Sequence, residues 1–160
     1  MNKKKFSEKP LVSIIIRTKN EERWIEHCLS SIKNQTIKDH EIIIVDNNSE
    51  DFSVQVASKY SDKIINVKEF LPGKAINAGI ENSKGDYIVI LSAHAIPTNN
   101  LWLENFVKAI EEDKNLAGVY GRQEPMSFSS ASDKRDMLLV FGLDRKYQIK
   151  DSFFHNANSI

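Results

Sequence analysis

The sequence predicts an α/β fold with a single, mostly parallel, twisted sheet flanked by helices. The strand-like segments are apolar at almost every position rather than at alternate positions, which is typical of strands covered on both faces. These segments alternate along the chain with amphipathic helical patterns, and strand–helix–strand units of this kind form parallel sheets with right-handed crossovers. A chain of 160 residues is long enough for one domain with a substantial core.

The first strand–helix unit lies near the amino terminus. Leu11–Ile16 is predicted to be a buried strand, and residues 17–20 form a polar turn after it. Glu21–Lys33 is predicted to be a helix, because its apolar residues share one face at helical spacing. Asn20 is expected to cap this helix, and the acidic residue that follows suits the positive end of the helix dipole.

The same alternation continues along the rest of the chain. Further strands are expected at Glu41–Val45, Ile64–Val67, Tyr87–Leu91 and Ala117–Gly121. Further helices are expected around Val56, Ala57 and Tyr60, over Leu71–Ile80 with Ile76 and Ile80 inward, after a cap at Asn99 or Asn100, and over Asp133–Phe141. Residues Ser152–Ile160 are expected to be extended.

Polar residues follow three of the predicted strands at the point where each strand ends. They are residues 17–20, 46–49 and 92–95, and Pro97 prevents the last strand from continuing. Because the carboxyl ends of parallel strands meet at one edge of a sheet, these clusters are expected to form a pocket there. Ligands of open α/β sheets bind in this position.

Composition narrows the function classes. Lys+Arg and Asp+Glu both number 22, which argues against nucleic acid as a partner. The single cysteine, Cys28, excludes an intramolecular disulfide and a cysteine-based zinc site, and fits a reducing compartment. No apolar run approaches the roughly 20 residues of a membrane span. A cytoplasmic protein is therefore expected; Lys3–Lys5 either form a solvated tail or touch the inner face of a membrane.

Four segments, in order, resemble family 2 glycosyltransferases. They are Val12-Ser-Ile-Ile-Ile-Arg-Thr-Lys-Asn-Glu21, Glu41-Ile-Ile-Ile-Val-Asp-Asn-Asn-Ser49, Asn77-Ala-Gly79 and Gly85 to Pro97. Within that family the chain is most similar to bacterial rhamnosyltransferase-like members, which share the Leu91-Ser-Ala-His94 and Gly121-Arg-Gln-x-Pro125 segments. The resemblance covers residues 11–125 well and 153–160 more loosely.

The resemblance implies a glycosyltransferase-A fold with a Rossmann-like nucleotide-binding half. It implies inverting transfer of a hexose or deoxyhexose from a nucleotide-diphosphate sugar to a hydroxyl of a cell-surface polysaccharide or related acceptor, either a saccharide or a lipid-linked saccharide. Residues 1–10 are then a flexible tail and 11–125 the donor-binding domain. Residues 126–160 begin an acceptor-binding half that is expected to be truncated.

The resemblance also implies the residues that contact the donor. The family's second strand usually ends in two aspartates, the second of which helps to hold the base; here they are Asp46 and Asn47, and an amide oxygen can still accept a hydrogen bond from a base. Lys74 is expected to approach the base or diphosphate from a helix start, although a solvated surface lysine is the alternative. The full expected set is Arg17, Thr18, Asn20, Asp46, Asn47, Lys74, Ser92 and Ala93.

The family's metal-binding motif differs in this chain. Where most relatives have aspartate, any residue and aspartate, this chain has Ser92, Ala93 and His94. His94 is expected to contact a divalent metal, Mn²⁺ or Mg²⁺, only when the donor's diphosphate supplies further ligands; by ligand type, imidazole suits manganese better. In the alternative, His94 hydrogen-bonds a loop carbonyl and cationic side chains replace the metal.

The catalytic base is expected beyond Ile160, because in relatives it follows the segment that Phe153–Ile160 resembles. This chain alone is therefore expected to be inactive, and Asp136 and Asp144 are not assigned the role. A nucleotide-sugar-binding module without catalysis is the first alternative. A dinucleotide-dependent oxidoreductase is disfavoured, because no Gly-x-Gly-x-x-Gly segment follows any predicted strand of this chain. A nucleotidyltransferase is disfavoured as well, because it would need a glycine-rich loop after the first strand and residues 17–20 contain no glycine.

Overall fold

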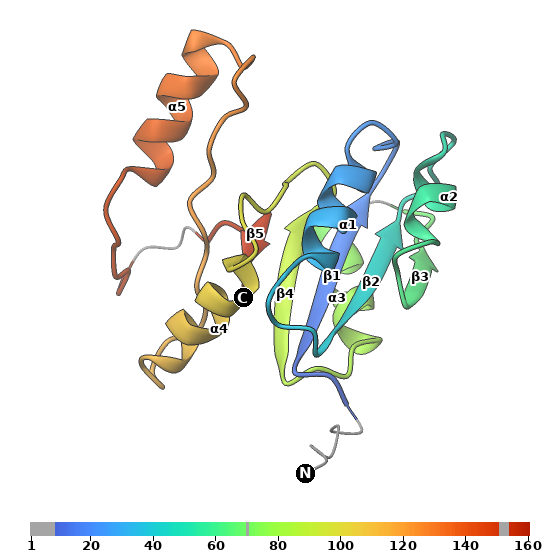
Figure 1. Cartoon of the computed structure of the whole chain (residues 1–160), viewed down its shortest axis with the longest axis horizontal. Coiled ribbons are helices and arrows are strands. Elements are labelled where there is room, and N and C mark those ends of the chain that lie inside the picture. Colours follow the sequence, from blue (N-terminus) through green and yellow to red (C-terminus); the bar gives the residue numbers. More distant parts are fainter. Residues whose placement is uncertain (1–8, 70, 151–153) are drawn as a thin grey trace.

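The computed structural model describes residues 9–69, 71–150 and 154–160. Its strands form one sheet in the order β3-β2-β1-β4-β5, in which only the β4–β5 pairing is antiparallel. The predicted fold class is therefore confirmed (Figure 1). The strands are β1 (Val12–Thr18), β2 (His40–Asp46), β3 (Lys63–Asn66), β4 (Tyr87–Ser92) and β5 (Asn158–Ser159). The helices are α1 (Ile25–Lys33), α2 (Ser53–Ala57), α3 (Pro72–Glu81), α4 (Trp102–Glu111) and α5 (Ala131–Phe141).

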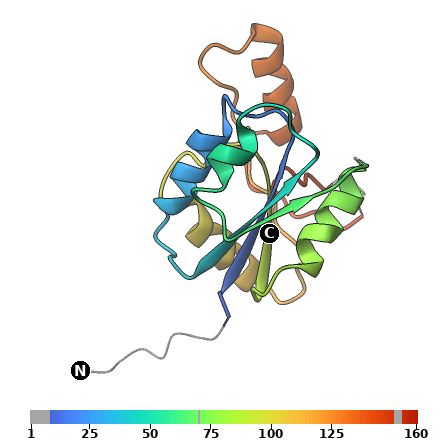
Figure 2. The same cartoon turned by 90° about the vertical axis from the view of Figure 1, so that its right-hand side faces the viewer.

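Helices cover both faces of the sheet, which explains the continuous apolar runs. Ile14 and Ile44 belong to a core cluster that also contains buried residues of α1, α2 and α4. Ile15 and Val45, from the same two strands, point to the other face and pack with Ala75 of α3. Figure 2 shows α1 and α3 on opposite sides of the strands. Because successive strand residues face opposite sides, the central positions of β1 (14–16) and of β2 (42–45) are all apolar and all buried.

The edge of the sheet where β1 and β4 begin is joined by hydrogen bonds around one buried hydroxyl. Ser13 Oγ donates to Glu41 Oε1 at 2.5 Å and accepts from the backbone N–H of Gly85 at 2.8 Å. Glu41 Oε1 also accepts from the N–H of Lys84 at 2.7 Å. A Cβ on Gly85 would lie 2.4 Å from the backbone nitrogen of Ser13, so the close approach of the turn to β1 requires glycine here.

Helix α1 begins later than predicted. It starts at Ile25 rather than Glu21, and Asn20 does not cap it. Asn20 instead adopts a left-handed conformation with φ of 53°, one that asparagine tolerates better than most residues. The Glu21 carbonyl accepts the N–H groups of Trp24 and Ile25, each at 2.9 Å. Residues 20–22 are therefore a loop.

The prediction of a strand at Ala117–Gly121 is wrong. This segment makes only an isolated bridge, between Tyr120 and Ser159. Val119 exchanges two backbone hydrogen bonds with Ile160, each 2.8 Å long. The position beside β4 is taken by β5, which lies in the segment expected to be extended. Residues 1–8 of the expected tail, and 151–153, lie outside the described residues.

Two details of the predicted helices also differ. Ile80 was expected to face inward but is 41% exposed, and Gly79 takes the buried position of α3. A Cβ on Gly79 would lie 2.4 Å from Cγ2 of Ile15, so the helix can approach the sheet closely only with glycine there. Asn99 accepts from the Leu101 N–H at 2.9 Å, but α4 begins beyond it, at Trp102, without a side-chain cap.

Helix α5 stands apart from the sheet (Figure 1). Its first turn has a capping box, in which Ser130 and Asp133 each accept from the other's backbone N–H. None of its residues is buried, and Leu139 is 75% exposed. The helix predicted at Asp133–Phe141 is confirmed, but it contributes no buried residue to the core.

Gln35 links the end of α1 to the start of α4 from inside the protein, where it is 1% exposed. Its Nε2 donates to the carbonyl oxygens of Ser31 (3.0 Å) and Asn99 (2.8 Å), and its Oε1 accepts from the Leu103 N–H at 3.0 Å. The side chain thus satisfies a first-turn donor of α4 that has no partner within the helix.

The substitution Gln35→Leu is expected to lower the free energy of unfolding by about 3 kcal/mol, because it leaves buried donors and acceptors without partners at similar side-chain volume. Urea unfolding measures the change. Gln55→Leu is the control, since Gln55 is exposed on α2 and its replacement should shift stability by less than about 0.5 kcal/mol. Equal urea midpoints for the two variants would contradict the stabilising role of the Gln35 hydrogen bonds.

Candidate functional site at the carboxyl ends of the strands

The polar clusters predicted to meet at one edge of the sheet do meet there. In the β1–β2 pairing Thr18 is opposite Asp46, and in the β1–β4 pairing Arg17 is opposite Ser92. The backbone continues these pairings past the strand ends, since the Asn47 N–H donates to the Thr18 carbonyl at 3.0 Å. The three strand ends therefore hold their side chains in fixed register.

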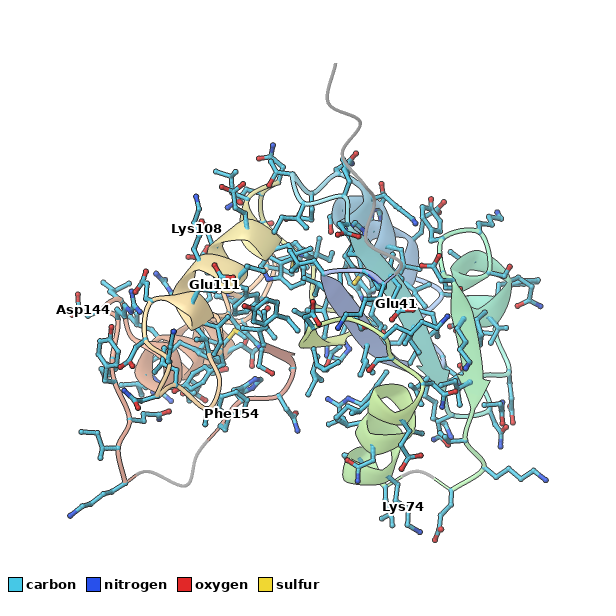
Figure 3. The ribbon with its side chains drawn as sticks, turned by 90° about the horizontal axis from the view of Figure 1, so that it is seen from below. Glu41, Lys74, Lys108, Glu111, Asp144 and Phe154 are labelled. Carbon is cyan, nitrogen blue, oxygen red and sulfur yellow. The ribbon has the colours of Figure 1, made fainter. Side chains whose placement is uncertain are left out.

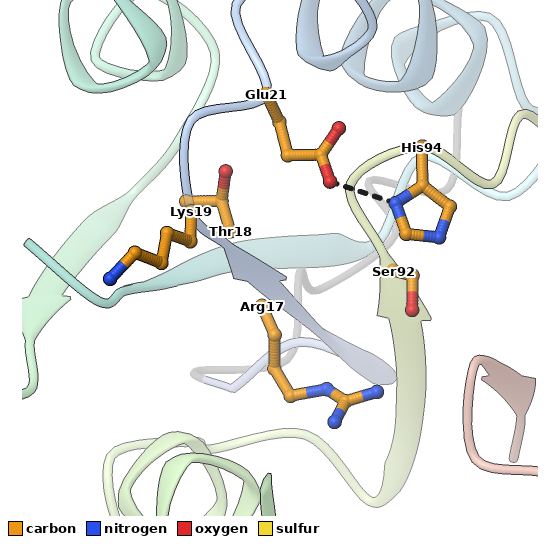
Figure 4. A pocket seen from close by; sticks show the side chains of 6 residues that line it. All are labelled: Arg17, Thr18, Lys19, Glu21, Ser92 and His94. Carbon is orange, nitrogen blue, oxygen red and sulfur yellow. Dashed lines mark hydrogen bonds and ion pairs between the residues drawn. The ribbon is translucent and has the colours of Figure 1, made fainter. Parts of the chain in front are cut away.

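A pocket of about 190 Å³ opens between the ends of β1 and β4. Figure 4 shows the side chains around it. Its lining residues are Arg17, Thr18, Lys19, Glu21, Ser92 and His94. Four of these were predicted to be site residues; Lys19 and Glu21 were not. The lining combines two cationic side chains and two hydroxyl groups with a carboxylate and an imidazole. The cationic and hydroxyl groups are suited to an anionic ligand.

Two polar groups of β1 at this pocket are not satisfied by the protein. Thr18 is 3% exposed, and its Oγ1 has no hydrogen-bond partner. Arg17 Nε also lacks one, and Arg17 Nη2 donates to Asn156 Oδ1 at a long 3.4 Å. Burial lowers the pKa of the Arg17 guanidinium below its usual value. Arg17 forms no ion pair with a carboxylate of the described residues, so a partly buried positive charge faces the pocket without an anionic partner.

The loop that follows β1 is attached to the loop that follows β2. The Asn20 N–H donates to Ser49 Oγ at 2.9 Å, and the Glu21 N–H donates to Ser53 Oγ at 2.7 Å. The Glu22 N–H donates to Asp51 Oδ2 at 3.0 Å. Asn20, predicted to contact the donor, thus shapes this loop and does not line the pocket.

Glu21 and His94 face each other across the pocket. Glu21 Oε1 lies 2.8 Å from His94 Nδ1, and the side chains are 21% and 61% exposed. A carboxylate accepts hydrogen bonds and does not donate them, so Nδ1 carries a proton and Nε2 is left with its lone pair in the neutral ring. The alternative prediction, a hydrogen bond from His94 to a loop carbonyl, is wrong, because the ring bonds the Glu21 carboxylate instead.

Asp46 and Asn47 lie behind the pocket at the end of β2, where both are buried. The Asp46 carboxylate accepts from Ser49 twice, from its Oγ at 2.5 Å and its N–H at 3.1 Å. Asn66 Nδ2 donates to the same carboxylate at 3.3 Å. Asp46 therefore holds the turn after β2, while the side chain of Asn47 makes no hydrogen bond with the described residues.

The turn after β4 is fixed by its backbone. The Ser92 N–H donates to the Ala157 carbonyl at 3.0 Å, and the Ala93 N–H donates to the Arg17 carbonyl at 3.2 Å. Ala93 is 1% exposed, so it serves as a small buried spacer between a pocket-lining serine and His94. This attachment on both sides sets the direction of the histidine.

Lys74 is not part of this pocket. It pairs with Glu69 at 3.0 Å and is 64% exposed. Figure 3 shows its side chain at the outer end of α3. Of the predicted donor contacts, three line the pocket: Arg17, Thr18 and Ser92. The others line neither the pocket nor the cleft beside it: Asn20, Asp46, Asn47, Lys74 and Ala93.

A larger cleft of about 740 Å³ lies on the other side of His94, between the turn after β4 and residues 122–129. Its apolar lining includes Trp102 and Met137. Its polar lining includes Gln123, whose Nε2 lies 3.0 Å from Nδ1 of His155. Burial, and then the nearby Arg17, lower the pKa of His155. Among the described residues, His94 alone lines both the pocket and the cleft, so ligands in the two sites would meet there.

The residues at His94 fit a divalent metal only together with a ligand. Within the described ranges, no group of three or more histidine, cysteine or acidic side chains is placed to hold a metal ion. His94 offers one imidazole nitrogen, and Glu21 already accepts a hydrogen bond from the same ring. Oxygen atoms of a bound diphosphate would have to complete the coordination.

The described part of the chain contains no helix long and apolar enough to cross a membrane.

Comparison with known proteins places this site in context. The sequence profile of the family described as Glycosyl transferase family 2 matches residues 13–160. A glucuronosyltransferase of Methanococcus voltae, named for a dolichyl N-acetyl-α-D-glucosaminyl phosphate substrate, is 31% identical over 91% of this chain. A poly(ribitol-phosphate) β-glucosyltransferase of Bacillus spizizenii is 32% identical over 88% of it. The chain spans 50% and 25% of the length of these two relatives.

Solved structures show the same fold. The mannosyltransferase PcManGT of Pyrobaculum calidifontis, solved with GDP-Man and Mn²⁺, matches 83% of this chain with a TM-score of 0.66 and 23% identity. TarS of S. aureus, solved with UDP-GlcNAc, matches 72% with a TM-score of 0.58 and 25% identity. The matched regions make up 39% and 37% of those chains.

Proposed function

Because this chain belongs to glycosyl transferase family 2, we propose that it is the donor-binding part of an inverting glycosyltransferase that uses a nucleotide-diphosphate sugar. The acceptor is a hydroxyl of a cell-surface polysaccharide or of a related saccharide, free or lipid-linked. The names of the relatives support these classes, since one includes a dolichyl-linked sugar phosphate and another a poly(ribitol-phosphate). The single cysteine favours action in the cytoplasm, and Lys3–Lys5 would allow contact with the inner face of the membrane.

One observation carries the donor assignment: Arg17 and Thr18 line the same pocket, Arg17 Nε and Thr18 Oγ1 have no hydrogen-bond partner, and Arg17 pairs with no carboxylate of the described residues. A diphosphate supplies the anionic oxygens that both groups lack, and hydrogen bonds between charged groups are about twice as strong as neutral ones. Asn47, whose side chain has no hydrogen bond with the described residues, is the candidate contact for the base.

His94 is the proposed metal ligand, through Nε2. His94 would hold a divalent ion together with the diphosphate, and such an ion would supply Lewis acidity for the departing nucleoside diphosphate. Arg17 adds positive charge at the same pocket, and the large cleft beside His94 is the proposed position of the acceptor. The resemblance of the Leu91–His94 and Gly121–Pro125 segments favours a rhamnosyltransferase-like specificity.

A binding module without catalysis is the second candidate, and the carboxylates support it for this chain alone. An acceptor hydroxyl must lose a proton as it attacks the anomeric carbon, which requires a base within hydrogen-bond reach. Glu21 is bonded to His94, and Glu124, in the large cleft, pairs with Arg122 at 3.3 Å. No other carboxylate of the described residues lines the pocket or the cleft, so donor binding without transfer is expected.

Nucleotide binding tests the proposal. UDP, TDP, GDP and their sugars, including a rhamnose donor, are compared by thermal shift with Mn²⁺ and with chelator. A ligand at 100 times its dissociation constant should add about 2.7 kcal/mol of stability. His94→Ala should remove the dependence on manganese while leaving binding in chelator unchanged; His27→Ala, an exposed histidine on α1, is the control. If no nucleotide raises the midpoint of the folded protein, the donor assignment fails.

A further inference from the structure

We propose that Glu21 is a positioning residue, which holds His94 in the tautomer and direction that present its Nε2 to the donor's diphosphate and metal. The inference rests on the proposed function, and deepens it by assigning a role to a residue that neither the family's metal motif nor the helix pattern points to. Its starting point is the 2.8 Å bond between Glu21 Oε1 and His94 Nδ1.

The backbone of Glu21 is fixed independently of its side chain. Its N–H donates to Ser53 Oγ, and its carbonyl accepts from Trp24 and Ile25. The preceding residue, Asn20, is fixed in turn, because its Oδ1 accepts from the Glu50 N–H at 2.9 Å. The side chain therefore leaves a rigid loop in a set direction, and no backbone hydrogen bond is lost when that side chain is replaced.

His94 needs such a partner more than a buried histidine would. Its side chain is 61% exposed, and Glu21 is the only hydrogen-bond partner of its ring among the described residues. Without it the ring is free to rotate and to exchange its proton between the two nitrogens. With it, Nδ1 is occupied and the second ring nitrogen points away from Glu21, as Figure 4 shows.

This arrangement is the one in which histidine binds metals most effectively. A ligating imidazole almost always donates its other N–H to a carboxylate or carbonyl, and loss of that partner typically weakens metal binding by about ten- to a hundredfold. Here the bond also connects the loop after β1 to the turn after β4. Glu21 thereby joins the two sides of the pocket at the point where the large cleft begins.

The tautomer gives a direct test that needs neither nucleotide nor metal. Long-range proton–nitrogen correlation of the ¹⁵N-labelled histidines is recorded at about pH 8.5, about two units above the pKa of histidine in model peptides. His94→Ala identifies the His94 signals. In the wild type, Nε2 should carry the shift of an unprotonated nitrogen. Glu21→Gln keeps an acceptor and should preserve this pattern, whereas Glu21→Ala should lose it. A wild-type ring with its proton on Nε2 overturns the proposal.

The second measurement is the ratio of UDP affinity with Mn²⁺ to that in chelator, by calorimetry. Glu21→Ala should lower this ratio by about ten- to a hundredfold. Glu22→Ala removes the adjacent carboxylate, which contacts the Phe52 N–H at 3.1 Å and not His94, and should leave the ratio unchanged. The double variant Glu21→Ala/His94→Ala should match His94→Ala alone, because Glu21 acts only through the histidine.

The outcomes separate this inference from the proposed function. A double variant that is clearly weaker than His94→Ala would make Glu21 a ligand in its own right and overturn the positioning role. An unchanged ratio in Glu21→Ala would overturn it as well. If wild-type protein binds no nucleotide diphosphate, the proposed function fails, while the nitrogen shifts still report whether Glu21 fixes the ring.

Discussion

Arg17→Met is expected to raise the stability of the unliganded protein by about 1 kcal/mol and to lower its affinity for UDP by about ten- to a hundredfold. The gain in stability follows because a partly buried charge without an anionic partner is costly to bury. The loss of affinity follows because hydrogen bonds to charged groups are worth about 1.5–3 kcal/mol. Methionine keeps the length and apolar stem of the side chain without the charge.

Urea unfolding and calorimetry measure the two effects. Arg135→Met is the control, because Arg135 is 71% exposed on α5, pairs with Asp136 and lies outside the pocket and the cleft. It should change neither quantity appreciably. If Arg17→Met lowers stability and leaves UDP affinity unchanged, Arg17 is a structural residue and not a diphosphate contact. A higher stability together with a lower affinity for UDP would indicate a binding residue that is retained at the expense of stability.

Gly85→Ala is expected to lower the free energy of unfolding by about 3 kcal/mol. The added Cβ would meet backbone, 2.4 Å from the nitrogen of Ser13 and 2.7 Å from the carbonyl carbon of Val12. Backbone of a central strand cannot move aside as the end of a flexible side chain can, so the strain of overpacking is not relieved. The shift would also disturb the Gly85 N–H bond to Ser13 Oγ.

Gly73→Ala is the matched control for this substitution. Gly73 lies in the first turn of α3, and a Cβ added there would meet no neighbouring segment within 4 Å. Alanine favours the helix and restricts the unfolded chain, so stability should rise by about 0.5–1 kcal/mol. Urea unfolding should therefore show a lower stability for Gly85→Ala and a higher stability for Gly73→Ala. Equal losses of stability in the two variants would show that the turn before β4 tolerates a side chain.

The parallel sheet could be predicted because its determinants are local in sequence. The runs at Leu11–Ile16, Glu41–Val45 and Tyr87–Leu91 are apolar enough to require cover on both faces, and they became β1, β2 and β4. The polar edge followed from strand direction alone, so Arg17, Thr18, Ser92 and His94 were predicted together and lie around one pocket.

The features that were not predicted depend on contacts between distant segments. Helix α1 could have started at Glu21 by local pattern, but the N–H groups of residues 20–22 find acceptors in the loop after β2 instead. For this reason the local pattern indicates a helix residue at Glu21 rather than a site residue. Likewise, residues 117–121 have a strand-like composition, but Asn158–Ser159 pair with β4 in their place.

The bonds that join β1, β2 and the turn before β4, and the residues that line the pocket, lie at opposite ends of the same strands. The amino-terminal ends are held by Ser13, Glu41 and Gly85, whose bonds close the sheet, whereas the residues that line the pocket lie at or beyond the carboxyl-terminal ends. The side chains of Ser92 and His94 take no part in the bonds around Ser13. A substitution in the pocket and a substitution at the amino-terminal ends of the strands therefore alter separate sets of contacts.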